Sequence, residues 1–243
     1  EVIASDTATA SEGAAINALT GDATFDVSDS AQAMADALSG NASALDDAET
    51  VTVLGGSATV SEAISIQGVS GYQDAASSYD IVDAASVLAV AGNTEIGDAG
   101  VGEVIASDTA TASEGAAINA LTGDATFVVA DSAQAVIQAL SANSISLDDA
   151  DSVVVTNIAD ASEGISLNSF AKAVQFNVSD TLESLITNLS SGNLNEAASI
   201  TITDVGQGGL DVSPTSGADY NEFAELKTLD YVLSASLLNN PDS

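Results

Sequence analysis

An exact internal repeat constrains this chain more than any other feature of its sequence. The 25 residues from Glu1 to Phe25 return without a change from Glu103 to Phe127, at a spacing of 102. The similarity continues beyond the identical block, since LDDA occurs at both 45–48 and 147–150. Self-similarity at a fixed period is the signature of repeat architectures. We therefore predict a repeat protein whose function belongs to the array rather than to one pocket.

A shorter period of about 50 residues lies within the longer one. Ser-Glu pairs mark it at Ser11, Ser61, Ser113 and Ser162. A second series consists of strand-like segments that end in aspartate: FDVSD, YDIVD, FVVAD and FNVSD, ending at Asp29, Asp83, Asp131 and Asp180. The two series interleave, so each unit contains two halves of about 25 residues, a length typical of solenoid repeats.

The first half of each unit is predicted to be a strand followed by a helix. In residues 176–180, apolar and polar side chains alternate, which is the period of a strand. Leu182, Leu185 and Leu189 then recur with the spacing of one helical face. Either Asp180 or Thr181 is placed to be the N-cap of that helix.

The second half begins with a strand rich in β-branched residues, as at 51–54, 153–156 and 200–203. A Ser-Glu pair and a short apolar run follow. Ser113 is predicted to cap the helix there, with Glu114 in its first turn. Gly115 weakens this helix prediction, and the equivalent residues 61–66 also fit a strand.

These patterns predict an α/β fold, a repeat solenoid with parallel strands and short helices, at about 25 residues per strand-helix half-unit. Tandem β-sandwich adhesin modules of about 100 residues are the alternative, favoured by the long period. We expect stacked repeats over 1–204, duplicated as 1–102 and 103–204. Residues 205–243 depart from the pattern and are expected to be a variant terminal repeat or an interface segment.

The charge balance excludes several functions. The chain has 36 acidic residues against two lysines, Lys172 and Lys227, and it has no Arg, no His and no Cys. Its net charge of −34 repels phosphate backbones and anionic membrane surfaces. No apolar run approaches the roughly 18 residues of a membrane span. We therefore expect no nucleic-acid partner and no membrane insertion.

The composition also argues against an enzyme. Catalytic triads and nitrogen- or sulfur-ligated zinc sites need residues that the chain lacks. A glycosidase that uses two carboxylates is the remaining enzymatic alternative, but sugar sites usually contain aromatic platforms and the chain has no Trp. We expect no enzymatic activity and no small-molecule substrate.

Calcium is the cofactor that the carboxylates suggest, because Ca²⁺ binds six to eight oxygen ligands. Aspartates on strands ~4.8 Å apart would repel each other by about 1 kcal/mol in water and about 3.5 kcal/mol at an effective dielectric of about 20. Against calcium stands the interpretation that each strand-end aspartate caps the next helix, which stabilises by about 1 kcal/mol, and that the paired aspartates form solvated turns. The candidate ligands stand at strand ends or in paired turns: Asp29, Asp46, Asp47, Asp83, Asp131, Asp148, Asp149, Asp180 and Asp204.

The segments at 79–89 (YDIVDAASVLA) and 176–204 (FNVSDTLESLITNLSSGNLNEAASITITD) resemble the repeats of long secreted bacterial surface proteins. Giant calcium-dependent adhesins and the cell-surface proteins of marine cyanobacteria are similar. The resemblance implies an extracellular scaffold, often loaded with Ca²⁺. The chain lacks the Gly-Gly-x-Gly-x-Asp nonapeptides of toxin-type calcium repeats, so those sites do not transfer.

Together these features predict a structural segment of a secreted cell-surface or filament-forming protein. Because the sequence begins inside a repeat, we expect a longer parent chain. The expected partners are neighbouring repeats or further copies of the chain. A calcium-dependent adhesin or binding module is the alternative function.

Overall fold

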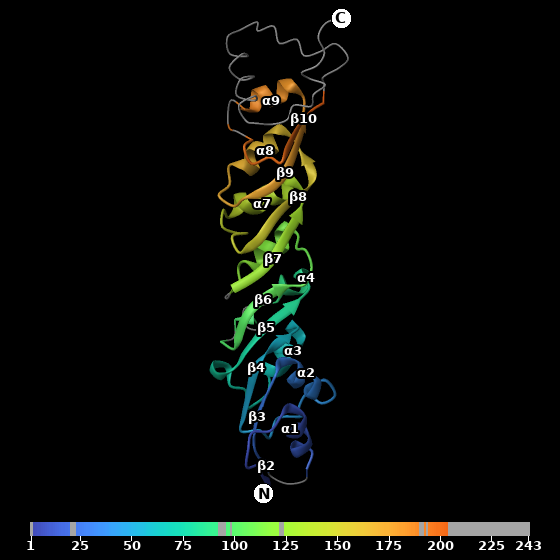
Figure 1. Ribbon diagram of the computed structural model, residues 1–243, viewed down its shortest axis with the longest axis vertical. Coiled ribbons are helices and arrows are strands. Elements are labelled where there is room, and N and C mark those ends of the chain that lie inside the picture. The colour runs from blue at the N-terminus through green and yellow to red at the C-terminus, as the bar shows by residue number, and fades with distance from the viewer. Residues whose placement is uncertain are drawn as a thin grey trace, which may run out of the picture. The chain divides into compact units, whose positions relative to one another are not determined.

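The computed structural model describes residues 2–19, 23–91, 96–97, 99–121, 124–189, 192 and 194–203. Helices and strands alternate along this part of the chain (Figure 1). The strands are β1 (Val2–Ile3), β2 (Ala23–Thr24), β3 (Asp26–Asp29), β4 (Thr50–Ala58), β5 (Ser78–Asp83), β6 (Val101–Ala106), β7 (Asp124–Asp131), β8 (Ala150–Ala159), β9 (Val174–Asp180) and β10 (Ser199–Ile202). The α-helices are α1 (Ala10–Asn17), α2 (Ala31–Ser39), α3 (Val60–Gln67), α4 (Ala85–Leu88), α6 (Ala112–Ile118), α7 (Ala133–Ala142), α8 (Ala161–Asn168) and α9 (Leu182–Leu189), and a 3-10 helix spans Asp74–Ala76.

All strand pairs among the described residues are parallel. Hydrogen-bonded neighbours follow the chain order from β3 to β10 in an eight-stranded sheet, and β1 pairs separately with β2. Successive parallel strands need a connection that returns to the same end of the sheet, and here helices or turns supply it. The predicted α/β class with parallel strands is confirmed. The β-sandwich alternative is wrong for the described residues, because sandwich strands are antiparallel.

The chain divides into two compact units. The first contains residues 1–110, 114–128 and 149–151, and the second contains 111–113, 129–148 and the residues from 152 onward. In the first unit α1, α2 and α3 pack side by side, with α1 on β3 and α3 on β5. In the second unit α7, α8 and α9 pack side by side, with α8 on β9. Each unit is therefore a helix layer over a parallel sheet.

The core is built from the alternation that the strands show in sequence. Phe176 and Val178 of β9 are buried, whereas Gln175 and Asn177 between and beside them are exposed. The helices contribute stripes such as Ala133, Val136 and Leu140, all of them at most 1% exposed. Because a β-strand presents alternate residues to one face, each strand adds one aromatic or aliphatic layer to the core.

Close packing explains the glycine of the Ser-Glu-Gly segments. A Cβ atom at Gly164 would lie 2.7 Å from Val178 Cγ2 and 2.8 Å from Leu194 Cδ2, and Gly13 has an equivalent contact of 2.7 Å with Val27. Glycine at this place in α1 and α8 therefore allows the helix to lie against a strand that follows it. The residues at 61–66, for which a strand was the alternative, lie in helix α3.

Two predictions concern C-terminal residues that the structure does not describe. The expected variant segment 205–243 and the candidate ligand Asp204 lie outside the described residues.

Candidate functional site: carboxylates at the strand ends

The aspartates that end the first-half strands each bind two backbone N–H groups. Asp131 Oδ1 accepts a hydrogen bond from Ser132 N–H at 2.7 Å, and its Oδ2 accepts one from Ala112 N–H at 3.0 Å. Ala112 is the first residue of α6, which precedes the strand of Asp131 in the chain. The carboxylate thus joins the end of one strand to the start of the preceding helix.

The same geometry recurs at three further strand ends. Asp29 bridges Ser30 N–H and Ala10 N–H at 2.8 and 3.1 Å. Asp83 accepts hydrogen bonds from Ala84 N–H at 2.8 Å and from Val60 N–H at 3.1 Å. Asp180 accepts them from Thr181 N–H at 2.8 Å and from Ala161 N–H at 3.0 Å.

The second-half strands use a reduced version of this bridge. Asp108, just after β6, accepts from Ala85 N–H at 2.6 Å, and Asn157 in β8 accepts from Ala133 N–H at 2.7 Å. In β4 the residue 102 positions before Asn157 is Gly55, which has no side chain and a φ of 78°. The bridge can therefore be made by an amide in place of a carboxylate, and β4 has no side chain at this position to make it.

Elementary electrostatics explains why carboxylates occupy these places. The first N–H groups of a helix have no partner within the helix and carry the positive end of its dipole. A carboxylate there satisfies a donor and is stabilised without a cationic side chain. This suits a chain with two lysines and 36 acidic residues.

The pKa of Asp180 reflects these bonds. Burial raises the pKa of this carboxyl, but hydrogen bonds from Ser184 Oγ at 2.6 Å and from Ala161 and Thr181 N–H outweigh it. The pKa therefore lies below its ordinary value of 3.8. The environment thus favours the ionised form, in which both oxygens are free to accept N–H bonds.

The N-caps of the helices differ in part from the prediction. For the first-half helices the cap is the residue after the aspartate, since the Ser30, Ser132 and Thr181 side chains accept from N–H groups three residues on. Thr181 was one of the two residues predicted for this role. The aspartates instead cap the preceding helix, which the sequence did not reveal.

The Ser-Glu prediction is wrong about the serine. The N-caps are Thr9, Thr59 and Asp160, two residues before the serine, and the glutamate closes a capping box with each of them. Ser113 likewise lies inside α6 rather than at its cap. In one box, hydrogen bonds from the backbone N–H and then the hydroxyl of Thr9 hold the pKa of Glu12 below its ordinary value of 4.5.

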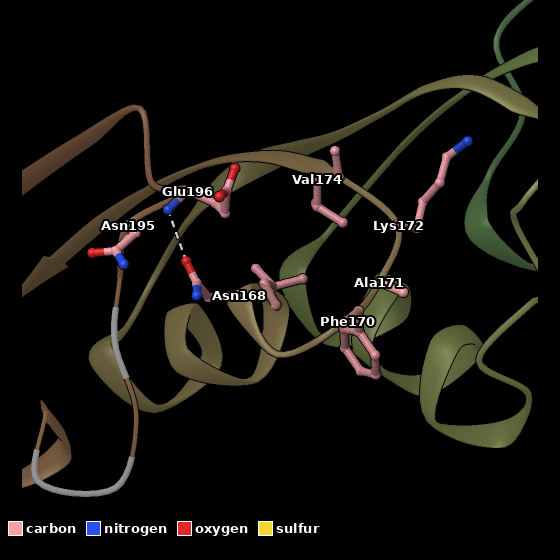
Figure 2. Close-up of a pocket in the computed structure, with 9 residues that line it drawn as sticks. Asn168, Phe170, Ala171, Lys172, Val174, Asn195 and Glu196 are labelled. Atoms are coloured by element: carbon pink, nitrogen blue, oxygen red, sulfur yellow. Dashed lines mark hydrogen bonds between the residues drawn. The ribbon is translucent and has the colours of Figure 1, made fainter.

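A second recurring bridge was missed altogether. Asn17 and Asn119 accept hydrogen bonds at 2.9 Å from Asp47 N–H and Asp149 N–H, 30 residues later. Asn168 accepts one from Glu196 N–H at 2.8 Å, which Figure 2 shows. The only signal in the sequence is the spacing of the three asparagines, 102 and 49, which matches the repeat. These amides fix the turns that precede β4, β8 and β10.

The paired aspartates in those turns remain exposed. Among the described residues, the carboxylates of Asp46, Asp47, Asp148 and Asp149 receive no hydrogen bond, although the backbone oxygen of Asp148 accepts one from Lys172 Nζ at 2.9 Å. In the described part of the chain no group of three or more acidic residues lies together as a metal site. The structure thus joins the strand-end candidates to helices and leaves the turn candidates in solvent.

A hollow of about 380 Å³ adjoins one of these turns. Figure 2 shows its lining, with Phe170, Val174 and the bonded pair Asn168 and Glu196, and with Lys172 directed away from that pair. The described residues that line it do not bring an acid, a base and a nucleophile together.

Comparison with known proteins gave no matching family model, no similar curated protein and no similar solved structure. Within the described ranges, no helix has the length and apolar character that crossing a membrane requires.

Proposed function

We propose that the chain is a structural, non-enzymatic segment of a secreted repetitive cell-surface or extracellular filament-forming protein. Its repeats form an α/β solenoid and assemble by stacking. The partners are neighbouring repeats of a longer chain or further copies of this one.

The observation that carries the proposal is the strand-end bridge. The helices at Ala10, Val60, Ala112 and Ala161 each obtain an acceptor for their first N–H from the strand that follows. A half-unit alone leaves that donor without a partner, which costs about 1–3 kcal/mol if the group is buried. Repeats that complete one another in this way are stable as arrays, and an array suits a scaffold better than a single site does.

The charge distribution supports the same reading. Carboxylates that neutralise helix N-termini need no lysine or arginine, so the remaining acidic groups can cover the exterior. A strongly negative surface keeps an assembly soluble and prevents lateral aggregation. Screening lengths fall to about 8 Å near 0.15 M salt, so close approach of such chains is favoured in saline surroundings.

Sedimentation and electron microscopy of the chain across protein and salt concentrations test the proposal. We expect filaments or end-to-end oligomers that grow with both concentrations. A uniform particle of the single-chain mass, 23.9 kDa, under every condition would contradict it.

A calcium-dependent adhesin or binding module is the second candidate. It is favoured by the exposed neighbouring carboxylates Asp46 and Asp47, repeated as Asp148 and Asp149. Thermal melting with calcium and with excess chelator, at fixed ionic strength, separates the candidates. Calcium dependence predicts a melting temperature many degrees lower in chelator, abolished in a variant with all four aspartates changed to Asn. Equal melts in calcium and chelator would exclude it.

A further inference from the structure

The turn after α2 contains the tripeptide Asn41-Ala42-Ser43, in which all three residues are exposed. Ser43 N–H donates a hydrogen bond to Asn41 Oδ1 at 3.2 Å, which closes an Asx turn. The preceding residue, Gly40, has open space around it, since an added Cβ would meet nothing within 4 Å. The turn is therefore exposed, with open space beside Gly40.

The side chains of this tripeptide are available for chemistry. Asn41 uses its carbonyl oxygen in the turn, and in the described part of the chain its Nδ2 donates no hydrogen bond. The Ser43 hydroxyl likewise has no partner there. Other hydrogen bonds hold the backbone of the turn in place. Asn41 N–H donates to Leu38 O at 3.2 Å, and Asn17 Nδ2 donates to Ser43 O at 3.0 Å. The turn thus presents an amide nitrogen and a hydroxyl two residues apart in a fixed arrangement.

We propose that Asn41 is an acceptor for N-linked glycosylation. Asn-x-Ser is the acceptor triplet, and surface turns are where it is used. The proposal rests on the proposed export of the chain, because the reaction occurs on exported proteins. Its co-reactant is a lipid-pyrophosphate-linked oligosaccharide.

The reaction exchanges one bond for another. A bond forms between Asn41 Nδ2 and C1 of the first sugar, and the bond between that carbon and the pyrophosphate oxygen breaks. The lipid pyrophosphate leaves with the bonding electron pair. The transferase base takes the proton lost from the amide, so no oxidant or reductant is needed.

Two other Asn-x-Ser triplets occur, and the asparagine of each lies within a strand or a helix. Asn177 lies within β9, paired with β8 on one side and β10 on the other, and its Oδ1 accepts from Ser199 Oγ at 2.6 Å. Asn188 lies in α9 and donates through Nδ2 to Ser184 O at 2.9 Å. A transferase that reaches its acceptor at an exposed surface turn would have to open a central strand or a helix to use them.

The duplication provides a matched control. Asn143 stands 102 residues after Asn41 and closes the same Asx turn, with Ile145 N–H donating to its Oδ1 at 3.3 Å. Ile145 replaces the serine, so the triplet is absent although the turn is the same. Its side chain is 58% exposed, so Ile145→Ser creates a triplet there without disturbing the core.

The test treats the purified folded chain with an oligosaccharyltransferase that requires only the Asn-x-Ser triplet, together with its lipid-linked donor. Intact mass and peptide mapping locate the glycans. We expect one glycan, at Asn41, in the wild type. Asn41→Gln and Ser43→Ile should remove it, and Ile145→Ser should add a second, at Asn143. The urea-denatured chain, diluted into the reaction, should also become modified at Asn177 and Asn188.

An unmodified Asn41 in the folded chain, while the denatured chain is modified, would overturn the proposal. So would modification of folded Asn177 or Asn188 at the rate of Asn41. Assembly is measured separately by sedimentation. A chain that forms filaments without accepting a glycan contradicts this inference alone, whereas a glycosylated chain that stays monomeric contradicts the proposed function alone.

Discussion

Asp131 Oδ2 accepts a hydrogen bond from the backbone N–H of Ala112, 19 residues earlier in the chain, at 3.0 Å. This bond makes the first turn of α6 depend on the last residue of β7. Asp29, Asp83 and Asp180 repeat it, so the starts of α1, α3 and α8 likewise depend on a strand that follows.

Removal of this carboxylate should loosen the helix that it caps. We expect Asp131→Ala to cost about 1–2 kcal/mol, since it removes a capping acceptor. Asp131→Asn should cost less, because Asn157 accepts the equivalent bond from Ala133. Urea denaturation gives the free energy of unfolding, and amide exchange should show Ala112 as the group that loses protection. Equal losses in the two variants would mean that the bridge needs both carboxylate oxygens and that an amide of the same volume cannot replace them.

Acid should weaken the bridge at Asp180. Its pKa is below 3.8 in the folded chain and ordinary in the unfolded chain. The stabilisation is therefore complete above the unfolded pKa and is lost as pH falls through the folded pKa. We expect the stability difference between wild type and Asp180→Asn to shrink as pH falls below about 4.

Ser184→Ala provides the control for this pH dependence. It removes one of the hydrogen bonds that lower the pKa of Asp180, so the folded pKa should rise and the acid-dependent part should become smaller. Melts of the three proteins at a series of pH values measure the effect. A stability difference that does not change with pH would contradict it.

The close helix–strand contact at Gly164 predicts sensitivity to one added methyl group. Gly164→Ala gains about 1 kcal/mol of helix propensity. However, its Cβ would lie within 3 Å of Val178 and Leu194, both at most 1% exposed and unable to move freely. Overpacking of this kind costs about 1–3 kcal/mol, so we expect net destabilisation.

Gly40→Ala is the matched substitution for this measurement. Gly40 ends α2 with a right-handed backbone and open space around it. The Gly40→Ala substitution should be neutral or should stabilise the chain by up to about 1 kcal/mol. If Gly164→Ala proved as stable as Gly40→Ala in urea, the packing explanation would be wrong.

The short helix α4 lacks a cap that its counterparts possess. Ala84 stands at its N-cap with φ −62° and ψ 143°, close to the values of −70° and 157° at Ser30, but it supplies no side-chain acceptor. We expect Ala84→Ser to stabilise the chain by about 0.5–1 kcal/mol. Ala89→Ser, at the other end of the helix where no N–H is free, should give no such gain in the urea midpoint.

The general fold could be predicted because its signals are local and repeated. Alternation in FNVSD predicted β9, and the spacing of Leu182, Leu185 and Leu189 predicted α9. The parallel pairing followed from the short period. Gly115 counted against a helix, because no local pattern shows the kind of contact that the equivalent Gly164 makes with residues distant in sequence.

The role of the strand-end aspartates could not be predicted to the same depth. Their recurrence was evident, and helix capping was one of the two roles considered. However, sequence adjacency pointed to the following helix, whereas the fold places Ala112 beside Asp131 and Ala161 beside Asp180. The asparagine bridges joined residues 28 or 30 positions apart, beyond the reach of local capping rules.

The distance in sequence between donor and acceptor has a consequence for the history of such chains. The two partners of each described strand-end bridge lie 19 to 24 residues apart, because the bridge joins a helix to the strand of the next half-unit. Copying of a whole period, which the identical blocks 1–25 and 103–127 record, therefore inserts each helix together with its acceptor. A lineage can lengthen or shorten this protein by complete periods in one genetic event, and the helix starts that have a bridge keep it. A deletion out of step with the period would separate a helix from its carboxylate.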